Sequence, residues 1–225
     1  MTHYLVLFVE EARSHAANVD LSKAKVPVGG EPVWARPIRQ IKAMGSAAVP
    51  MIVLDLLRNR RSDRVELGRE LLREIGPDAL PAWRGVFDID DSRARRRCAG
   101  VLADWGVEHA AVRQLLLELR ADSDFGVRAA AYRGLGTSDE YVDMLVQALT
   151  TETDPFVQRE IALALGGHRS RKAAGAVVDY LARSIEASDR RGMLAADEAL
   201  RKMSGRAERA DLRTWRSWLS TVRDE

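Results

Sequence analysis

The chain has 225 residues, a size that suits one or two domains, and a formal net charge of +2 at neutral pH. Charged residues make up 30% of it and apolar residues 46%, a balance that excludes a fully disordered chain and a bundle of membrane helices. Aromatic residues amount to only 6%, and Ala, Leu and Arg recur throughout, so helices are expected rather than strands.

The N-terminal segment, residues 1–32, differs from the rest of the chain. Residues 2–19 can form one helix, and the prolines and glycines of residues 20–32 predict a loop. The apolar run at residues 4–9 is too short for a membrane span and lacks the basic residues that precede the apolar part of a signal peptide. We therefore expect a cytoplasmic protein whose first 32 residues are a cap or a tether.

A period of about 30 residues governs the middle of the chain. Glycines recur at intervals of 30 or 31 residues, at positions 45, 76, 106, 136 and 166. The residues one and four positions before each glycine are apolar, which places them on one face of a helix that the glycine ends in a left-handed conformation. A second helical pattern follows each glycine, and Asp and Ser in the intervening turns are expected to cap the next helix. Each unit is therefore predicted to be a helix pair.

The last repeat and the C-terminal segment depart from this period. Gly166 and Gly205 are 39 residues apart, which predicts either a longer helix or an inserted loop around residues 187–191. Residues 206–225 are expected to form a cap, because Trp215, Leu219 and Val222 fall on one helical face. Repeat arrays need such a segment to cover the apolar face of their last unit.

Two segments at equivalent positions of the period read SDFGVRAAAYRGLG at residues 123–136 and TDPFVQREIALALGG at residues 153–167. Together with GSAAVPMIVLDLL at 45–57 and GPDALPAW at 76–83, they resemble short bacterial HEAT repeats of the type also found in phycobilisome-lyase proteins. The resemblance covers about residues 33–205, although the Val-Arg pair of the pattern is intact only at residues 127–128. It implies an all-α superhelix, a HEAT-like solenoid of about five helix pairs with a cap at each end. Its implication for function is broad, since such arrays serve as scaffolds, adaptors, nucleic-acid binders and, rarely, enzymes.

The residue types that carry catalysis or bind metals form no recognisable motif. The four histidines are spread over separate elements, without the spacing of a metal site or of a hydrolytic base. Cys98, the single cysteine, falls within a repeat helix and is interpreted as a small packing residue, aligned with Arg128 and Gln158 of later units. The aspartates at 88, 90 and 91 lie in a turn before a run of arginines, which favours helix capping over a site. No catalytic residue, cofactor or metal is predicted.

Basic residues recur on one face of the second helices, away from the apolar stripe, and form the candidate partner-binding surface. They are Lys42, Arg69, Arg73, Arg96, Arg133 and Arg159. Glu66 and Glu70 lie three residues before Arg69 and Arg73 and predict simple ion pairs, whereas Arg133 has no acid at that spacing. An adjacent acidic column and a net charge of −5 over residues 107–167 disfavour a continuous phosphate-binding groove.

The protein is predicted to be a non-catalytic scaffold or adaptor. The concave face of its solenoid is expected to bind a protein partner that has an acidic surface. Two alternatives remain open on the sequence. One is a nucleic-acid-binding protein similar to the HEAT-like glycosylases that act on alkylated bases. The other is a lyase or chaperone for a prosthetic group, as the phycobilisome-lyase resemblance implies.

Overall fold

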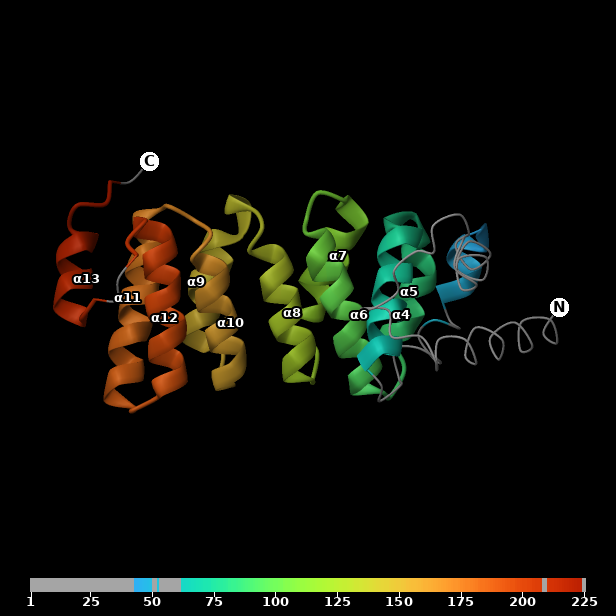
Figure 1. Ribbon diagram of the computed structural model, residues 1–225, viewed down its shortest axis with the longest axis horizontal. Coiled ribbons are helices and arrows are strands. Elements are labelled where there is room, and N and C mark those ends of the chain that lie inside the picture. Colours follow the sequence, from blue (N-terminus) through green and yellow to red (C-terminus); the bar gives the residue numbers. More distant parts are fainter. Residues whose placement is uncertain (1–42, 50–51, 53–61, 208–209, 224–225) are drawn as a thin grey trace, which may run out of the picture. The chain divides into compact units, whose positions relative to one another are not determined.

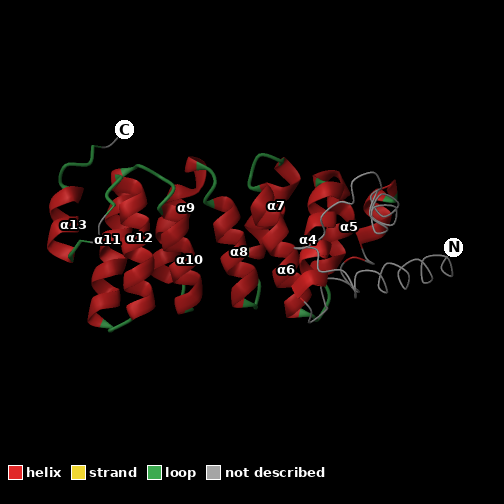
Figure 2. Cartoon of the chain, viewed as in Figure 1, coloured by secondary structure: helices red, strands yellow, loops and turns green. Residues whose placement is uncertain are grey.

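A computed structural model describes residues 43–49, 52, 62–207 and 210–223. Within these ranges every regular element is a helix and no strand occurs, as Figure 2 shows. The fold is therefore all-α, as predicted from the composition and the repeat. The expected N-terminal cap or tether, residues 1–32, lies outside the described residues.

The chain divides into two compact units, residues 1–101 and 102–225, and each is considered by itself. The described part of unit 1 begins with a short 3-10 turn, η1 (Gly45–Ala48), and continues with α4 (Ser62–Ile75), η3 (Pro77–Ala79) and α5 (Leu80–Phe87). The next helix, α6 (Ser92–Trp105), crosses the boundary between the units. The η1 and η3 turns pack against α5 and against each other.

Unit 2 contains three further helix pairs and a final short helix (Figure 1). The first pair is α7 (Ala110–Leu119) and α8 (Phe125–Leu135). The second is α9 (Val142–Thr151), preceded by the turn η4 (Asp139–Tyr141), and α10 (Pro155–Leu165). The third is α11 (Arg171–Glu186) and α12 (Arg190–Ser204), and α13 (Leu212–Leu219) follows. The second helices α8, α10 and α12 pack in sequence against one another, and the first helices α9 and α11 do the same.

Asp and Ser side chains cap the N-termini of several helices, at turns where the sequence predicted such caps. Asp124 accepts hydrogen bonds from the amides of Gly126 and Val127 at the start of α8, and Asp154 does the same for the amides of Phe156 and Val157 at the start of α10. Single side-chain caps begin the last three helices, from Ser170, Asp189 and Asp211. Because the first amides of a helix have no partner within it, these caps determine where each helix starts.

The repeated glycines differ in their backbone conformation. Gly45, Gly76 and Gly106 have φ between 53° and 82°, the left-handed conformation that the pattern predicted, and Gly205 also has it, with φ of 73°. Gly136 and Gly166 have φ of −67° and −58°, so the prediction was wrong for these two. A Cβ atom on Gly136 would lie 2.6 Å from the Cβ of Ala164, and one on Gly166 would lie 2.8 Å from the Cα of Ala199. Glycine is required there by close contact between neighbouring second helices.

The long last repeat is explained by longer helices. α11 has 16 residues and α12 has 15, compared with 10 and 11 in the preceding pair. The turn between them is short, with Ser188 in a left-handed conformation (φ 56°) and the amide of Asp189 donating to the carbonyl of Ser184. Of the two predicted explanations, the longer helix is confirmed and the inserted loop is not.

The apolar stripe of the second helices forms the core of each repeat. The residues four and five positions before the glycines are buried wherever they are described, including Leu72, Leu102 and Ile161. The residue just before the glycine is buried at Leu135 and Leu165 but only half-buried at Ile75 and Trp105. The half-buried residues precede left-handed glycines, where the helix ends abruptly and its last side chain lies at the margin of the core.

Replacing Leu165 with alanine is expected to lower the free energy of unfolding by about 2 to 5 kcal/mol, because its side chain is fully buried and a cavity would remain. Leu194→Ala is the matched control, since that leucine on α12 is exposed and its loss should change stability by less than about 0.5 kcal/mol. Urea denaturation followed by circular dichroism measures both changes. Equal effects of the two substitutions would show that the assigned helix face is wrong.

Candidate partner-binding surface

The six predicted basic residues are distributed over both units. Lys42 lies outside the described residues. Unit 1 carries Arg69 and Arg73 on α4 and the exposed Arg96 on α6, whereas unit 2 carries Arg133 on α8 and Arg159 on α10. The pair in unit 2 lies on successive second helices that pack against each other. Within unit 2, Arg133 and Arg159 therefore lie on one side of adjacent second helices.

Arg69 and Arg73 form ion pairs within their own helix, as their spacing predicted. The guanidinium groups lie 3.7 Å and 3.6 Å from the carboxylate of Glu66, and Arg73 also contacts Glu70. All four side chains are 30% or more exposed, and ion pairs of this kind contribute only about 0 to 1 kcal/mol each. These arginines belong to a mixed-charge helix surface.

Arg133 has an acidic partner that its own helix does not supply. Its Nη2 atom donates to a carboxylate oxygen of Asp104 at 3.1 Å, a residue 29 positions earlier on the preceding second helix, α6. Spacing along one helix had offered no acid, so this pairing was missed by reasoning within a single repeat. Both side chains are partly exposed, and the pair links successive repeats at the surface.

Arg159 has a different environment. Its guanidinium lies over the ring of Phe156, 5.7 Å from the ring centroid, and no carboxylate of the described chain forms an ion pair with it. Phe156 in turn contacts Phe125 of the preceding second helix in an edge-to-face arrangement, with centroids 5.6 Å apart and planes at 80°. Both phenylalanines are exposed. A phenylalanine follows the capping aspartate within two residues in both repeats, and this repeated pattern in the sequence indicates the aromatic contact, whereas the column of basic residues does not.

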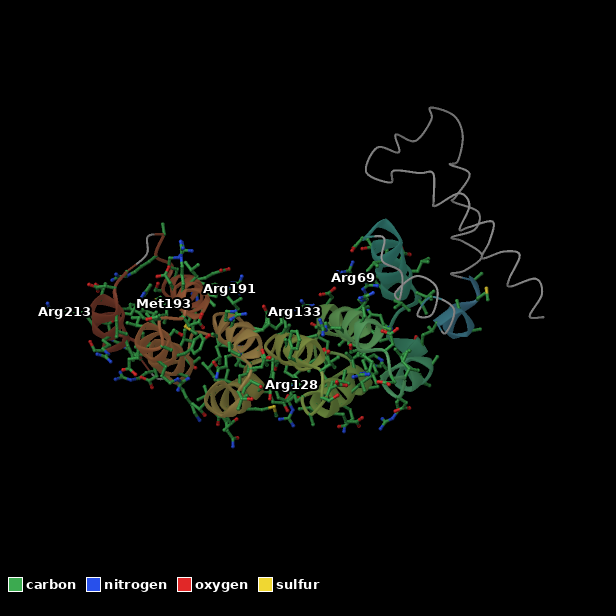
Figure 3. The ribbon with its side chains drawn as sticks, turned by 90° about the horizontal axis from the view of Figure 1, so that it is seen from below. Arg69, Arg128, Arg133, Arg191, Met193 and Arg213 are labelled. Carbon is green, nitrogen blue, oxygen red and sulfur yellow. The ribbon has the colours of Figure 1, made fainter. Side chains whose placement is uncertain are left out.

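Arg128 lies deeper in unit 2 than Arg133. Figure 3 shows Arg133 and Arg191 along one side of the unit and Arg128 between the rows of helices. The Arg128 guanidinium donates from Nε and Nη2 to the two carboxylate oxygens of Glu152, each at 3.0 Å, with side-chain exposures of 19% and 9%. The hydrogen bond from Arg128 lowers the pKa of the Glu152 carboxyl, and the same contact raises the pKa of Arg128. This half-buried pair joins the turns of two successive repeats.

The same region contains a hydrogen bond that recurs from repeat to repeat. Arg128 Nη1 donates to the carbonyl of Asp122 at 3.0 Å, and Gln158 Nε2 donates to the carbonyl of Glu152 at 2.7 Å. In unit 1 the corresponding donor is Arg95, which binds the carbonyl of Ile89 at 2.9 Å. In every case the side chain reaches back six residues and closes the turn before its helix. Cys98 matches Arg128 when positions are counted back from the repeat glycine, but on this count α6 begins three residues earlier than α8 does, so the residue that closes the turn is Arg95.

Comparison with known protein families identifies these stacked helix pairs. The family described as HEAT repeats matches residues 80–166 and 112–201, which together make up more than half of the chain. The chain belongs to the HEAT repeat family. Among solved structures, a crystal structure of an engineered protein from the Northeast Structural Genomics Consortium aligns with a TM-score of 0.42 and 20% identity, covering 88% of this chain and 96% of that one. No curated protein matches the chain significantly.

Cys98 is a packing residue of its HEAT repeat. The thiol is fully buried, and this burial strongly raises its pKa. A thiol held in its protonated form is a poor nucleophile. Within the described residues no group of three or more His, Cys, Asp and Glu side chains comes together in a metal-binding arrangement.

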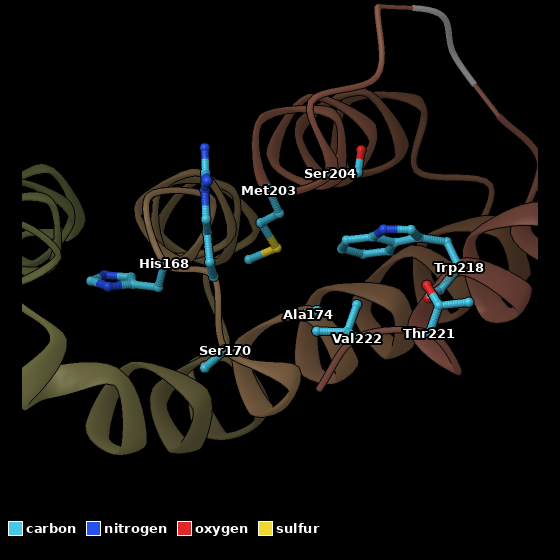
Figure 4. A pocket seen from close by; sticks show the side chains of 9 residues that line it. His168, Ser170, Ala174, Met203, Ser204, Trp218, Thr221 and Val222 are labelled. Carbon is cyan, nitrogen blue, oxygen red and sulfur yellow. The ribbon is translucent and has the colours of Figure 1, made fainter. Parts of the chain in front are cut away.

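A small cavity of about 210 Å³ lies beside the last helix of the array (Figure 4). Met203 and Trp218 face it from opposite sides, with Ala174 and Val222 between them. The ring of His168 points away from this space and contacts a carboxylate oxygen of Asp139 through Nδ1 at 2.5 Å. The cavity therefore presents apolar surface, hydroxyl groups and the side chain of Arg169.

A more open groove of about 450 Å³ runs between α9, α11 and α13 on the first-helix side of unit 2. Three basic side chains line it, and each is engaged within the unit. Lys172 pairs with Asp143 at 2.5 Å, whereas Arg171 and Arg183 each donate to a backbone carbonyl at 3.1 Å. The basic side chains that line this groove are therefore already bound to groups of the same unit. No helix in the described part of the chain is long and apolar enough to cross a membrane.

Proposed function

We propose that this HEAT array is a non-catalytic scaffold that binds a protein partner through the side of unit 2 formed by α8, α10 and α12. The proposal is supported by one observation above all. Successive second helices carry exposed apolar rings at Phe125 and Phe156, next to a guanidinium, that of Arg159, without a carboxylate partner among the described residues. Exposed apolar side chains flanked by polar groups are typical of protein-interaction surfaces.

The charge pattern favours a protein over a nucleic acid as the partner. Arg133 is paired with Asp104, and Glu160 follows Arg159 directly on α10. A phosphate backbone requires cations that are not offset by neighbouring acids, because affinity depends on how many phosphates are neutralised. A protein surface of alternating charge has no such requirement.

Reversing both arginines, in the variant Arg133→Glu/Arg159→Glu, is expected to abolish partner capture while lowering stability by no more than about 1 kcal/mol, because exposed ion pairs contribute little. The immobilised full-length chain would capture its partner from an extract of the source cells, and mass spectrometry would identify it. Purified partner would then be tested against the variant.

Arg216→Glu supplies the matched control, since it reverses an exposed charge on α13, away from α8 and α10. Capture that survives the double reversal would contradict the proposed surface. Capture that is lost after nuclease treatment would replace the protein partner with a nucleic acid.

A further inference from the structure

Exposed apolar side chains are unevenly distributed over the described part of the chain. Four large ones are exposed by 38 to 43%, namely Phe125, Phe156, Ile185 and Leu194. Three of these lie on second helices, one each on α8, α10 and α12, whereas Ile185 lies near the end of a first helix, α11. The second-helix side of unit 2 therefore carries a concentration of apolar surface exposed to water.

Phe125 and Phe156 occupy the first turns of α8 and α10, one and two residues after the capping aspartates Asp124 and Asp154. Their edge-to-face contact orients both rings, because this arrangement is preferred between aromatic side chains. The rings nevertheless remain more than one-third exposed. A side chain from a partner can thus pack against two rings whose positions are already determined by the repeat.

Arg159 lies one helical turn after Phe156 and places a positive charge at the same point. Glu160 is its neighbour in sequence, but neither this acid nor another described carboxylate forms an ion pair with its guanidinium. The aspartates next to the rings are already engaged, since Asp124 and Asp154 each accept two amide hydrogen bonds as helix caps. The guanidinium is therefore the group best placed to receive an acid from outside.

We propose that Phe125, Phe156 and Arg159 form a docking site for an acidic segment of a partner protein, in which an aromatic or large aliphatic side chain lies next to an Asp or Glu. The apolar side chain packs against the two rings, and the carboxylate accepts hydrogen bonds from the guanidinium, a pairing for which arginine geometry is well suited. This inference rests on the proposed function and specifies the chemistry of the partner. A nucleic acid fits less well, because the Arg159 guanidinium already covers a face of Phe156 on which a base would have to stack.

The test measures fluorescence polarisation of labelled peptides titrated with the full-length chain. The probe is a peptide of Asp and Glu residues interspersed with Phe and Leu. In one control peptide Asn and Gln replace the acids, and in the other Ser replaces Phe and Leu. We expect saturable binding of the probe, and binding weaker by about tenfold or more for each control peptide, since both parts of the site are needed.

Variants of the chain locate the binding. Phe156→Ala and Arg159→Gln are each expected to weaken probe binding by about tenfold, as loss of a central contact does. Ile185→Ala removes an apolar side chain of similar exposure, and Arg216→Gln removes an exposed charge on another helix; both should leave binding unchanged. Phe125→Ala provides a second test on another helix, and circular dichroism verifies that every variant is folded.

Three results would overturn the docking site: no saturable binding of the probe, equal binding of the control peptides, or equal losses in the control variants. Tighter binding of a labelled single-stranded RNA at the same residues would also overturn it. Capture of the purified partner separates this inference from the proposed function. If the double arginine reversal abolishes capture and Phe156→Ala does not, the aromatic site is wrong and the scaffold surface stands; if neither change affects capture, the surface itself is wrong.

Discussion

Replacing Arg128 with methionine is expected to lower the free energy of unfolding by about 2 to 3 kcal/mol, because the substitution leaves the half-buried Glu152 carboxylate without its counter-ion and its charge-assisted hydrogen bonds. The variant also loses the hydrogen bonds from Arg128 to the carbonyls of Asp122 and Ser123, which hold the turn before α8. Urea denaturation of the wild-type and variant proteins measures the difference. A change below about 1 kcal/mol would place this pair among ordinary surface ion pairs.

The double substitution Arg128→Met/Glu152→Met is the control for this result. Because it removes both charges together, no buried carboxylate remains unpaired, and much of the lost stability should return. Equal destabilisation by the single and double variants would mean that the carbonyl contacts of Arg128 matter more than its pairing with Glu152.

The pH dependence of stability provides an independent measure of the same pair. The folded protein holds the pKa of Glu152 below its ordinary value of 4.5, with the hydrogen bond from Arg128 as the largest cause. The corresponding stabilisation is therefore fully present above pH 4.5 and is lost as the pH falls through the lower, folded-state pKa. The difference in the free energy of unfolding between the wild type and Arg128→Met should accordingly become smaller as the pH falls below 4.5.

Deleting residues 211–225 is expected to cause aggregation or a loss of helical signal. Trp215 on α13 is fully buried in the core that α9 to α12 share, and Trp218 packs edge-to-face against it with centroids 5.7 Å apart. Removing both exposes the apolar face of the last HEAT repeat, which terminal elements normally cover. Size-exclusion chromatography and thermal melting monitor the outcome.

Trp215→Ala tests the same interface in a chain of full length. Its expected cost is about 3 to 5 kcal/mol, the range for truncating a large buried aromatic side chain. Arg216→Ala is the control on the same helix, since that side chain is exposed. A truncated chain that stays monomeric and keeps its melting temperature would make Trp215 and Trp218 candidates for partner binding instead.

The repeat and its helix boundaries were predictable because they depend on short-range patterns. The spacing of Leu135 and Leu165 from their glycines places both in the core whatever their neighbours are. Asp124 and Asp154 begin helices because their carboxylates reach amides only two or three residues away. The glycine period was equally visible, although it did not distinguish the left-handed Gly106 from Gly136, which is needed for helix contact.

The candidate surface was less predictable because several of its contacts cross from one repeat to the next, as those between Arg133 and Asp104 and between Phe125 and Phe156 do. Among the arginines of the predicted basic column, those of α4 pair within their helix, as spacing alone indicated. Arg133 instead pairs with an acid 29 residues away, and Arg159 with an aromatic ring that no charge pattern would select. The column is thus a set of different environments rather than one uniform basic surface.

By itself, the sequence determined that this protein is an all-α HEAT array, where the helices with Asp or Ser caps begin, and which stripe is buried, since a period of about 30 residues and local capping specify these features. Only the tertiary structure decided which partner each polar side chain contacts. An arginine on a helix surface can reach its own helix, the next repeat or water, and only the stacking of repeats selects among them. That stacking placed Arg128 against Glu152 and Phe125 against Phe156, because the side chains that meet between repeats are distant in the sequence.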